Sequence, residues 1–344
     1  MAGEVRPNPP AEGRGGEIFP AAVLSVPDAV PESPEAAHTG LAERGFALLC
    51  RSAAFAVAGL LLAVFVVLGV NAAPALHTFG FGFLTTEVWN PVTERFGAVA
   101  PIFGTLITSA IAMLIGLPLA LGAALFLNEY CPHRLRGPVI VAIELLAAVP
   151  SIIYGMWGLL VLAPFLSAHF QPFMTAWVGP IPILGALFQG PPFGIGMLTA
   201  GLILGFMVLP FICSVSCQVL ATVDPVLREA AYGVGATTWE VCRNVLLPFS
   251  RTGLLGAAML GLGRALGETM AVTFVIGNSH RISASLFAPG TTISASLANE
   301  FTEAVGDTYL SSLQALGLVL FLITFIVLAA ARLLMRHVER RAAQ

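Results

Sequence analysis

The chain has 344 residues, of which 57% are hydrophobic and only 10% are charged, and its formal net charge is −3. Soluble domains carry about 25% charged residues. The composition therefore excludes an ordinary soluble domain and, with several apolar runs of about 20 residues or more, predicts a polytopic membrane protein. The slightly acidic balance also leaves no basic surface for binding nucleic acid.

All 16 basic residues are arginines, and the sequence contains no lysine. A phosphate-binding loop for ATP needs a Gly-Lys-Ser/Thr sequence, and Schiff-base catalysis needs a lysine amine. We therefore expect a non-catalytic chain without a cofactor of its own. If transport is driven by ATP, the nucleotide and its Mg²⁺ must be bound by a separate subunit. The five cysteines contain no zinc-type C-x-x-C pair, and we expect no metal site.

Residues 1–45 differ from the rest because Pro, Glu, Ala and Gly dominate them. This composition is typical of a disordered tail. It is not typical of a signal peptide, because the first apolar run begins only near Ser52 and no short basic segment precedes it. We predict that residues 46–344 form one transmembrane domain.

Six apolar segments follow the tail, and even the shortest is long enough to cover about 30 Å of hydrocarbon. We predict transmembrane helices over 52–75, 98–126, 138–166, 193–217, 252–277 and 312–334. The third segment contains Pro150, where we expect a kink or a break. The predicted fold class is an all-α polytopic membrane protein with six transmembrane helices.

The arginines predict the orientation of this chain in the membrane. Of the 16, 13 fall before the first span, after the second, between the fourth and fifth, and at the end of the chain from Arg332 onward. Only Arg95 and Arg281 fall in the other loops, and Arg264 lies within the fifth span. By the positive-inside rule, both termini and the 218–251 loop are predicted to be cytoplasmic.

The cytoplasmic loop between the fourth and fifth spans begins with signals for a short helix. Asp224 is suited to cap the amino terminus, and Pro225 is suited to the first helical position. The helix is predicted to end near Tyr232, because Gly233 and Gly235 can adopt the left-handed conformation that terminates helices.

A second helix is predicted to follow in the same loop. Thr237 and Glu240 have the spacing of a capping box, and Pro248 is expected to bound the helix because the residue before proline avoids helical geometry. Residues 222–250 thus form a charged helix–turn–helix. Local signals are compatible with an ordered solvated loop or with a docking element for a cytoplasmic partner, whereas too few basic residues are present for reading DNA.

The segment 222–250 resembles the EAA loop of ABC-transporter membrane subunits, and we call it the EAA segment. The motif reads Glu-Ala-Ala, three residues, Gly, nine residues, and Ile-x-Leu-Pro. Its residues here are Glu229, Ala230, Ala231, Gly235, Leu247 and Pro248, with Val245 in place of Ile. The resemblance implies a coupling helix that docks into a groove of the ATP-binding subunit, within the transmembrane-domain fold of a type I ABC importer.

Two charges lie inside the predicted fifth span. Arg264 and Glu268 are four residues apart and would share one face of a continuous helix. Each costs about 2.5–3.5 kcal/mol at a helix centre in the membrane, so we expect both to face inward among other helices. One interpretation is an ion pair that neutralises itself. The other is a pathway-lining pair, in which Arg264 meets an anionic substrate and Glu268 holds Arg264 between passages.

Four further segments resemble PstC-type permease subunits of the phosphate-specific ABC transporter. They are "WNPVTERFGAVAPIFGTLITS" (89–109), "NEYCP" (128–132), "ELLAAVPSIIYGMWGL" (144–159) and "GLGRALGETMAVTFVIGN" (261–278). The resemblance covers nearly everything from the first span to the sixth. It implies that Arg264 and Glu268 belong to the phosphate translocation pathway, and that segment 89–97 faces the periplasmic binding protein.

The resemblance implies a multi-pass permease subunit of the bacterial inner membrane that imports inorganic phosphate. Its expected partners are a PstA-type permease, a dimer of ATP-binding subunits and a periplasmic phosphate-binding protein. One alternative is a permease for another oxyanion, such as sulfate or molybdate. The alternative from another class, a stand-alone secondary transporter or anion channel, gives no reason for an EAA-type segment.

Overall fold

The computed structural model describes residues 36–182 and 184–342. The chain divides into two compact units, residues 1–60 and 61–344, and the boundary lies within the first helix. In the described ranges the regular elements are helices, with one isolated β-bridge between Asn90 and Arg95. Six helices are long and apolar enough to cross a membrane. The predicted all-α fold class with six candidate spans is confirmed.

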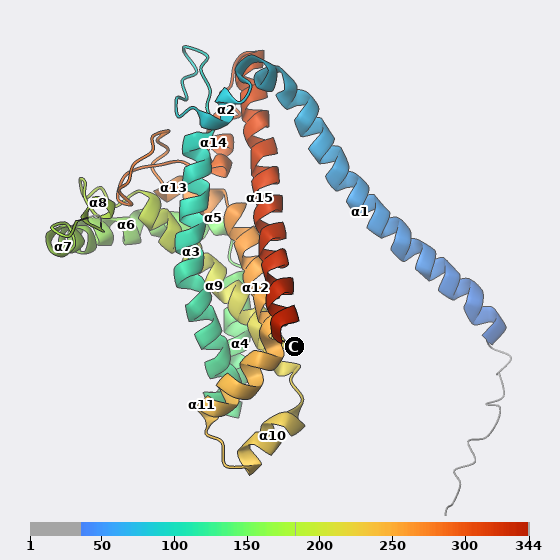
Figure 1. The fold of residues 1–344 in the computed structure, drawn as a ribbon. Helices are drawn as coiled ribbons and strands as arrows, with labels where there is room; N and C mark the ends of the chain where they lie inside the picture. The colour runs from blue at the N-terminus through green and yellow to red at the C-terminus, as the bar shows by residue number, and fades with distance from the viewer. Residues whose placement is uncertain (1–35, 183, 343–344) are drawn as a thin grey trace, which may run out of the picture. The chain divides into compact units, whose positions relative to one another are not determined.

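The elements follow one another in the order drawn in Figure 1. The α-helices are α1 Ala36–Phe79, α2 Gly82–Thr85, α3 Val99–Leu125, α4 His133–Ala147, α5 Ser151–Trp157, α6 Ala163–Phe165, α7 Gln171–Trp177, α8 Leu184–Leu187, α9 Met197–Ala221, α10 Pro225–Gly233, α11 Thr238–Val241, α12 Leu247–Leu266, α13 Met270–Val275, α14 Ile293–Glu300 and α15 Asp307–Ala342. The π-helical segments are η1 Phe126–Tyr130, η2 Gly158–Leu162, η3 Leu166–Phe170 and η4 Cys242–Leu246.

Two boundaries differ from the sequence prediction. Helix α1 begins at Ala36, so residues 36–45 are helical rather than part of a disordered tail; residues 1–35 lie outside the described residues. The predicted third span over 138–166 is interrupted at Pro150, which caps α5 in an extended conformation with ψ of 134°. The expected break is therefore present, and the third candidate span is Ser151–Trp177.

The core of the second unit is built around α9, the most buried of the candidate spans. Helix α9 lies beside α3 and α12 (Figure 1). Small residues allow the close approach to α3: a Cβ added at Gly116 would lie 3.0 Å from the carbonyl oxygen of Gly205. Such small-residue contacts are typical of helices packed within membranes.

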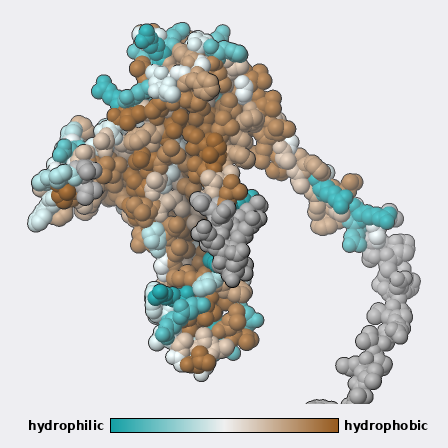
Figure 2. Space-filling view, in the orientation of Figure 1, coloured by the Kyte–Doolittle hydropathy of each residue, from teal (hydrophilic) through white to brown (hydrophobic). Residues whose placement is uncertain are grey.

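The two ends of the second unit carry different elements. Helices α10 and α11 lie at one end, and α2 and α14 lie towards the other (Figure 1). Figure 2 shows hydrophobic residues over the middle of this unit and hydrophilic residues gathered at both ends. This distribution is the one that a bundle spanning a hydrocarbon layer requires.

Candidate functional site

Helix α10 of the EAA segment forms as its sequence predicts. The Asp224 carboxylate accepts a hydrogen bond of 2.9 Å from the backbone nitrogen of Val226, and Pro225 occupies the first helical position. Gly235 takes a positive φ of 87°, whereas Gly233 is the last residue of the helix itself. The predicted amino-terminal cap is confirmed, and Gly235 alone of the two glycines provides the turn.

The second helix starts at the predicted capping box, but it does not end at Pro248. The backbone nitrogen of Thr237 donates to the Glu240 carboxylate at 2.8 Å, and the Thr237 hydroxyl accepts from the Glu240 nitrogen. From Thr238 to Leu266 the chain is then helical over 29 residues. A proline clashes with the carbonyl four residues earlier, and the π-helical segment η4 lies at that place and accommodates it. The prediction that Pro248 bounds the helix is wrong.

The EAA segment exposes large apolar side chains. Val226, Val234 and Trp239 are 65%, 87% and 60% exposed. Among the motif residues, Glu229, Ala230, Gly235 and Pro248 are exposed, while Ala231 and Leu247 are half-buried. Exposed apolar surface of this kind, rimmed by polar residues, marks an interaction site in stable proteins. The segment therefore carries exposed apolar side chains beside polar ones.

Helix α10 is attached to α3 and α9 through one arginine. The Arg228 guanidinium forms an ion pair of 3.1 Å with Glu129, at the end of η1, and donates to the carbonyl of Leu220 at 2.6 Å. The Tyr232 hydroxyl donates to the same Glu129 carboxylate at 3.3 Å. Partial burial, together with the Glu129 charge, raises the pKa of Tyr232, so this hydroxyl remains a donor. Helix α10 is thereby joined by side-chain contacts to the ends of two spans.

The predicted fifth span is broken beside its charged residues. Helix α12 ends at Leu266, and α13 begins only at Met270. The prediction of one helix over 252–277 is therefore wrong, and Arg264 and Glu268 do not share a helix face. Gly267 occupies the carboxyl-terminal cap with φ of −95° and ψ of 0°. The negative φ shows that the left-handed glycine cap is not used here.

The break separates the roles of the two charged side chains. Arg264 lies in the last turn of α12, where a positive charge is favourable for the helix dipole, and its guanidinium carbon is 5.6 Å from the ring centroid of Phe211. The Glu268 carboxylate instead accepts from the backbone nitrogen of Ala271 at 3.3 Å, within the first turn of α13. In the described part of the chain, no ion pair joins Arg264 to Glu268. The arginine charge is thus not neutralised by this glutamate.

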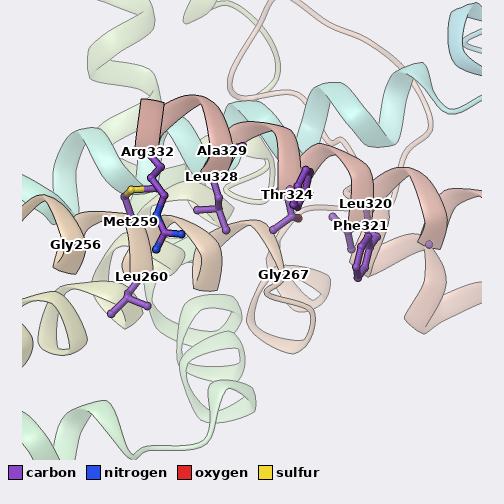
Figure 3. A pocket seen from close by; sticks show the side chains of 12 residues that line it. Gly256, Met259, Leu260, Gly267, Leu320, Phe321, Thr324, Leu328, Ala329 and Arg332 are labelled. Atoms are coloured by element: carbon purple, nitrogen blue, oxygen red, sulfur yellow. The ribbon is translucent and has the colours of Figure 1, made fainter. Parts of the chain in front are cut away.

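Two cavities meet at the same break. The larger, about 940 Å³, lies between α12 and α15 and is lined mostly by apolar side chains, with Arg332 near one end (Figure 3). It is chemically unsuited to a multiply charged anion. The smaller, about 460 Å³, includes three hydroxyl residues, Thr269, Ser294 and Thr302. The Ser294 hydroxyl is buried without a hydrogen-bond partner in the structure.

The arrangement at the break is suited to handling an anion. Arg264 supplies a permanent positive charge, and the hydroxyl groups beside the break can donate hydrogen bonds to oxygen atoms. Groups of three or more potential metal-ligating side chains are absent from the described residues. These groups are chemically able to interact with an oxyanion, although Arg264 itself lines neither of the two cavities.

Three features of this site were not predicted from the sequence. They are the ion pair of Glu129 with Arg228, the contact of Tyr232 with the same carboxylate, and the break at Gly267. Glu129 lies in the "NEYCP" segment, but nothing in its spacing shows a contact with a residue 99 positions away. Gly267 is followed by Glu268 and Thr269, a sequence that is compatible with a helix end and a new cap.

Comparison with known proteins gives the family. Residues 116–344 match the family model described as "Binding-protein-dependent transport system inner membrane component". The chain is 61% identical to the phosphate transport system permease protein PstC of Mesorhizobium japonicum, over 85% of this chain and 89% of the relative. The chain belongs to the PstC family of membrane permeases. The PstC protein of Haemophilus influenzae is 50% identical over 82% of this chain and 89% of its own length.

Solved structures share the fold of the chain at low sequence identity. A permease chain of the MetNI methionine ABC transporter, in an inward-facing conformation, covers 73% of this chain and 99% of its own with a TM-score of 0.52 and 19% identity. A chain of a bacterial alginate ABC transporter covers 88% of this chain and 98% of its own length, with a TM-score of 0.51 and 17% identity. The PstC-family chain therefore has the transmembrane fold of ABC transporters and is a multi-pass protein of the inner membrane.

Proposed function

We propose that this chain is the phosphate-translocating membrane subunit of an ATP-driven importer. The observation that carries the proposal is the 61% identity, over 85% of the chain, to a phosphate transport permease. The anion-suited break at Arg264 supports it from chemistry. The proposed substrate is inorganic phosphate, and the chain itself performs no bond-breaking step.

The proposed partners are a PstA-type permease, a dimer of ATP-binding subunits and a periplasmic phosphate-binding protein. The EAA segment has exposed apolar side chains, of which Val234 is more exposed than Val226 and Trp239. They support docking of an ATP-binding subunit there. The motif residues Glu229, Ala230, Ala231, Gly235, Leu247 and Pro248 are the proposed coupling residues. ATP and Mg²⁺ are bound by the partner, because the lysine-free chain has no phosphate-binding loop.

The proposed orientation follows the arginine distribution. Both termini and the EAA segment are cytoplasmic, and the end that carries α2 and α14 faces the periplasm. The binding protein then approaches the end opposite to the ATP-binding subunits. This separation allows substrate delivery on one side and energy input on the other.

The proposed mechanism uses the continuous helix from Thr238 to Leu266 as a lever. Closure of the ATP-binding subunits moves α10 and, through the Arg228–Glu129 ion pair, the ends of α3 and α9. The same movement acts on the far end of this helix, whose last turn carries Arg264. The helix has 29 residues and is about 44 Å long at about 1.5 Å per residue. Arg264 attracts the anion. Glu268 lies at the start of α13 and stabilises the break between α12 and α13. Alternating access then arises from two arrangements of these helices.

Phosphate uptake in cells that lack their own phosphate system tests this proposal. The chain is expressed with its cognate permease, ATP-binding subunit and binding protein, and competition by arsenate and by sulfate is measured. We expect uptake that arsenate blocks and excess sulfate does not. Blockage by sulfate but not arsenate would contradict the phosphate assignment, and gradient-driven transport by the purified chain alone would contradict the ATP-driven mechanism.

A further inference from the structure

A half-buried carboxylate lies at the end of the second unit opposite to the EAA segment. One Glu300 oxygen accepts hydrogen bonds of 2.6 Å from Trp89 Nε1 and 2.6 Å from the Tyr309 hydroxyl. Its other oxygen lies 2.7 Å from His280 Nε2. We call these four residues the Glu300 cluster. It joins three segments that are far apart in sequence, with Trp89 and Glu300 separated by 211 positions.

Aromatic rings enclose this carboxylate. The Trp89 indole stacks on the His280 ring at 5.2 Å and meets the Phe96 ring edge-on at 4.9 Å. Phe96, which is 2% exposed, stacks in turn on Tyr309 at 5.0 Å. Such aromatic pairs contribute beyond their buried area. The cluster therefore holds Trp89 and Phe96 in fixed positions.

These two aromatic residues bracket a short exposed hairpin, residues 90–95. Asn90 and Arg95 exchange backbone hydrogen bonds of 2.8 and 3.1 Å, and the Asn90 side chain accepts from the nitrogen of Val92 at 2.9 Å. Residues 91–95 are exposed, and Val92 at the tip is 92% exposed. The hairpin has no core of its own, so its position depends on the anchoring of Trp89 and Phe96 at its base.

Glu300 is in its ionised form in this cluster. Burial by itself would raise the pKa of Glu300, but the hydrogen bonds from His280, Tyr309 and Trp89, together with the Coulombic attraction of His280, outweigh it and lower that pKa below its usual value. An ionised carboxylate only accepts hydrogen bonds, so all three neighbours are held as donors around one acceptor. Removing this acceptor leaves three half-buried donors without this partner.

We propose that Glu300 is a positioning residue that fixes the hairpin 90–95 in the geometry that the binding protein recognises. The proposal rests on the proposed function, which places this end of the molecule in the periplasm. The exposed tip presents Val92 together with the polar residues Thr93 and Glu94 at this end of the molecule. Glu300 itself does not reach the partner and acts through Trp89.

The expected effect is on docking and not on the transport step. Without Glu300 the hairpin samples other positions. The apparent dissociation constant of the binding protein then rises in inverse proportion to the competent fraction, which is the fraction of complexes whose hairpin has the binding geometry. A competent fraction of one tenth raises the half-saturating concentration of binding protein about tenfold, which corresponds to about 1.4 kcal/mol. The maximal rate, reached when binding protein saturates the complex, stays close to that of the wild type.

The test is a titration of phosphate-loaded binding protein against the complete complex in proteoliposomes that contain ATP. Uptake is measured for the wild type, Glu300→Ala and the control Glu303→Ala, which removes an exposed carboxylate three residues away. We expect about a tenfold rise in the half-saturating concentration for Glu300→Ala only. Glu300→Gln, which retains one acceptor oxygen, should recover part of the loss.

Two results would overturn the role of Glu300. One is an unchanged half-saturating concentration in Glu300→Ala, and the other is a lowered maximal rate with no change in that concentration. If Glu300→Ala does not assemble, Trp89→Phe decides, because it keeps one aromatic ring for stacking and removes the Nε1 donor with the five-membered part of the indole. Its half-saturating concentration should rise about fivefold or more. Wild-type uptake that is independent of binding protein would instead contradict the proposed function.

Discussion

A methyl group added at Gly235 should damage coupling through backbone strain alone. Gly235 has φ of 87°, and a Cβ added there would meet no atom within 4 Å. A left-handed backbone costs a non-glycine residue about 1–2 kcal/mol, which lowers the population of the native turn about 5- to 30-fold relative to its alternatives. Because the turn sets the direction of α10, we expect Gly235→Ala to weaken binding of the ATP-binding subunit and to lower phosphate uptake.

Gly233 provides the matched control, since a Cβ there also meets nothing within 4 Å and the residue is helical. Gly233→Ala should be neutral or stabilising by about 0.5–1 kcal/mol. Gly235→Asn separates strain from steric blocking, because asparagine tolerates positive φ better than alanine but has a larger side chain. Co-purification of the ATP-binding subunit and uptake should decrease in the order wild type, Gly235→Asn, Gly235→Ala. Equal effects of Gly235→Ala and Gly233→Ala, or a greater loss with asparagine, would refute the reasoning.

Three further predictions concern other parts of the chain. Glu129→Gln leaves the partly buried Arg228 charge without its partner, at a cost below the about 3–5 kcal/mol of a fully buried pair. Uptake per ATP hydrolysed should therefore fall, and the swap Glu129→Arg with Arg228→Glu should restore part of it; an unchanged ratio would contradict the linkage. Because the pKa of Glu300 is lowered, its contribution is complete above the ordinary carboxyl value of about 4.3 and is lost as the pH falls through the lowered pKa. The difference in docking affinity between wild type and Glu300→Gln should therefore still be present at about pH 5, and its complete loss there would count against this role of Glu300. Gly104→Ala places a Cβ 1.9 Å from a backbone oxygen of the loop before α14. The thermal midpoint of the complex should therefore fall by the equivalent of about 1–3 kcal/mol or more. Gly122→Ala should leave the midpoint unchanged, because a Cβ added at Gly122 meets no atom within 4 Å.

Local signals predicted local structure well in this chain. The Asp224 cap, the Pro225 start and the Thr237–Glu240 capping box depend on residues within a few positions of one another, and all three are present. The apolar segments likewise predicted six candidate spans because length and composition suffice for that purpose. Their ends were less predictable, since apolar residues continue past the end of α12 at Leu266.

Features that depend on tertiary contacts could not be predicted. Pro248 is a helix breaker by local rules, yet the π-helical segment before it keeps the helix continuous. Arg264 and Glu268 have helical spacing, but Gly267 between them ends the helix. The Glu300 cluster brings together side chains about 200 residues apart in sequence, and no periodicity in one sequence reports such a contact.

The most direct test of the account is radiolabelled phosphate uptake by the complete reconstituted complex with Arg264→Gln. The glutamine keeps hydrogen-bonding capacity and removes the charge, and Met259→Gln on the same helix serves as a control for a polar substitution. We predict that Arg264→Gln abolishes or strongly reduces ATP-dependent uptake while the complex still assembles and the binding protein still stimulates ATP hydrolysis. Normal uptake with Arg264→Gln would contradict the claim that the anion passes this arginine.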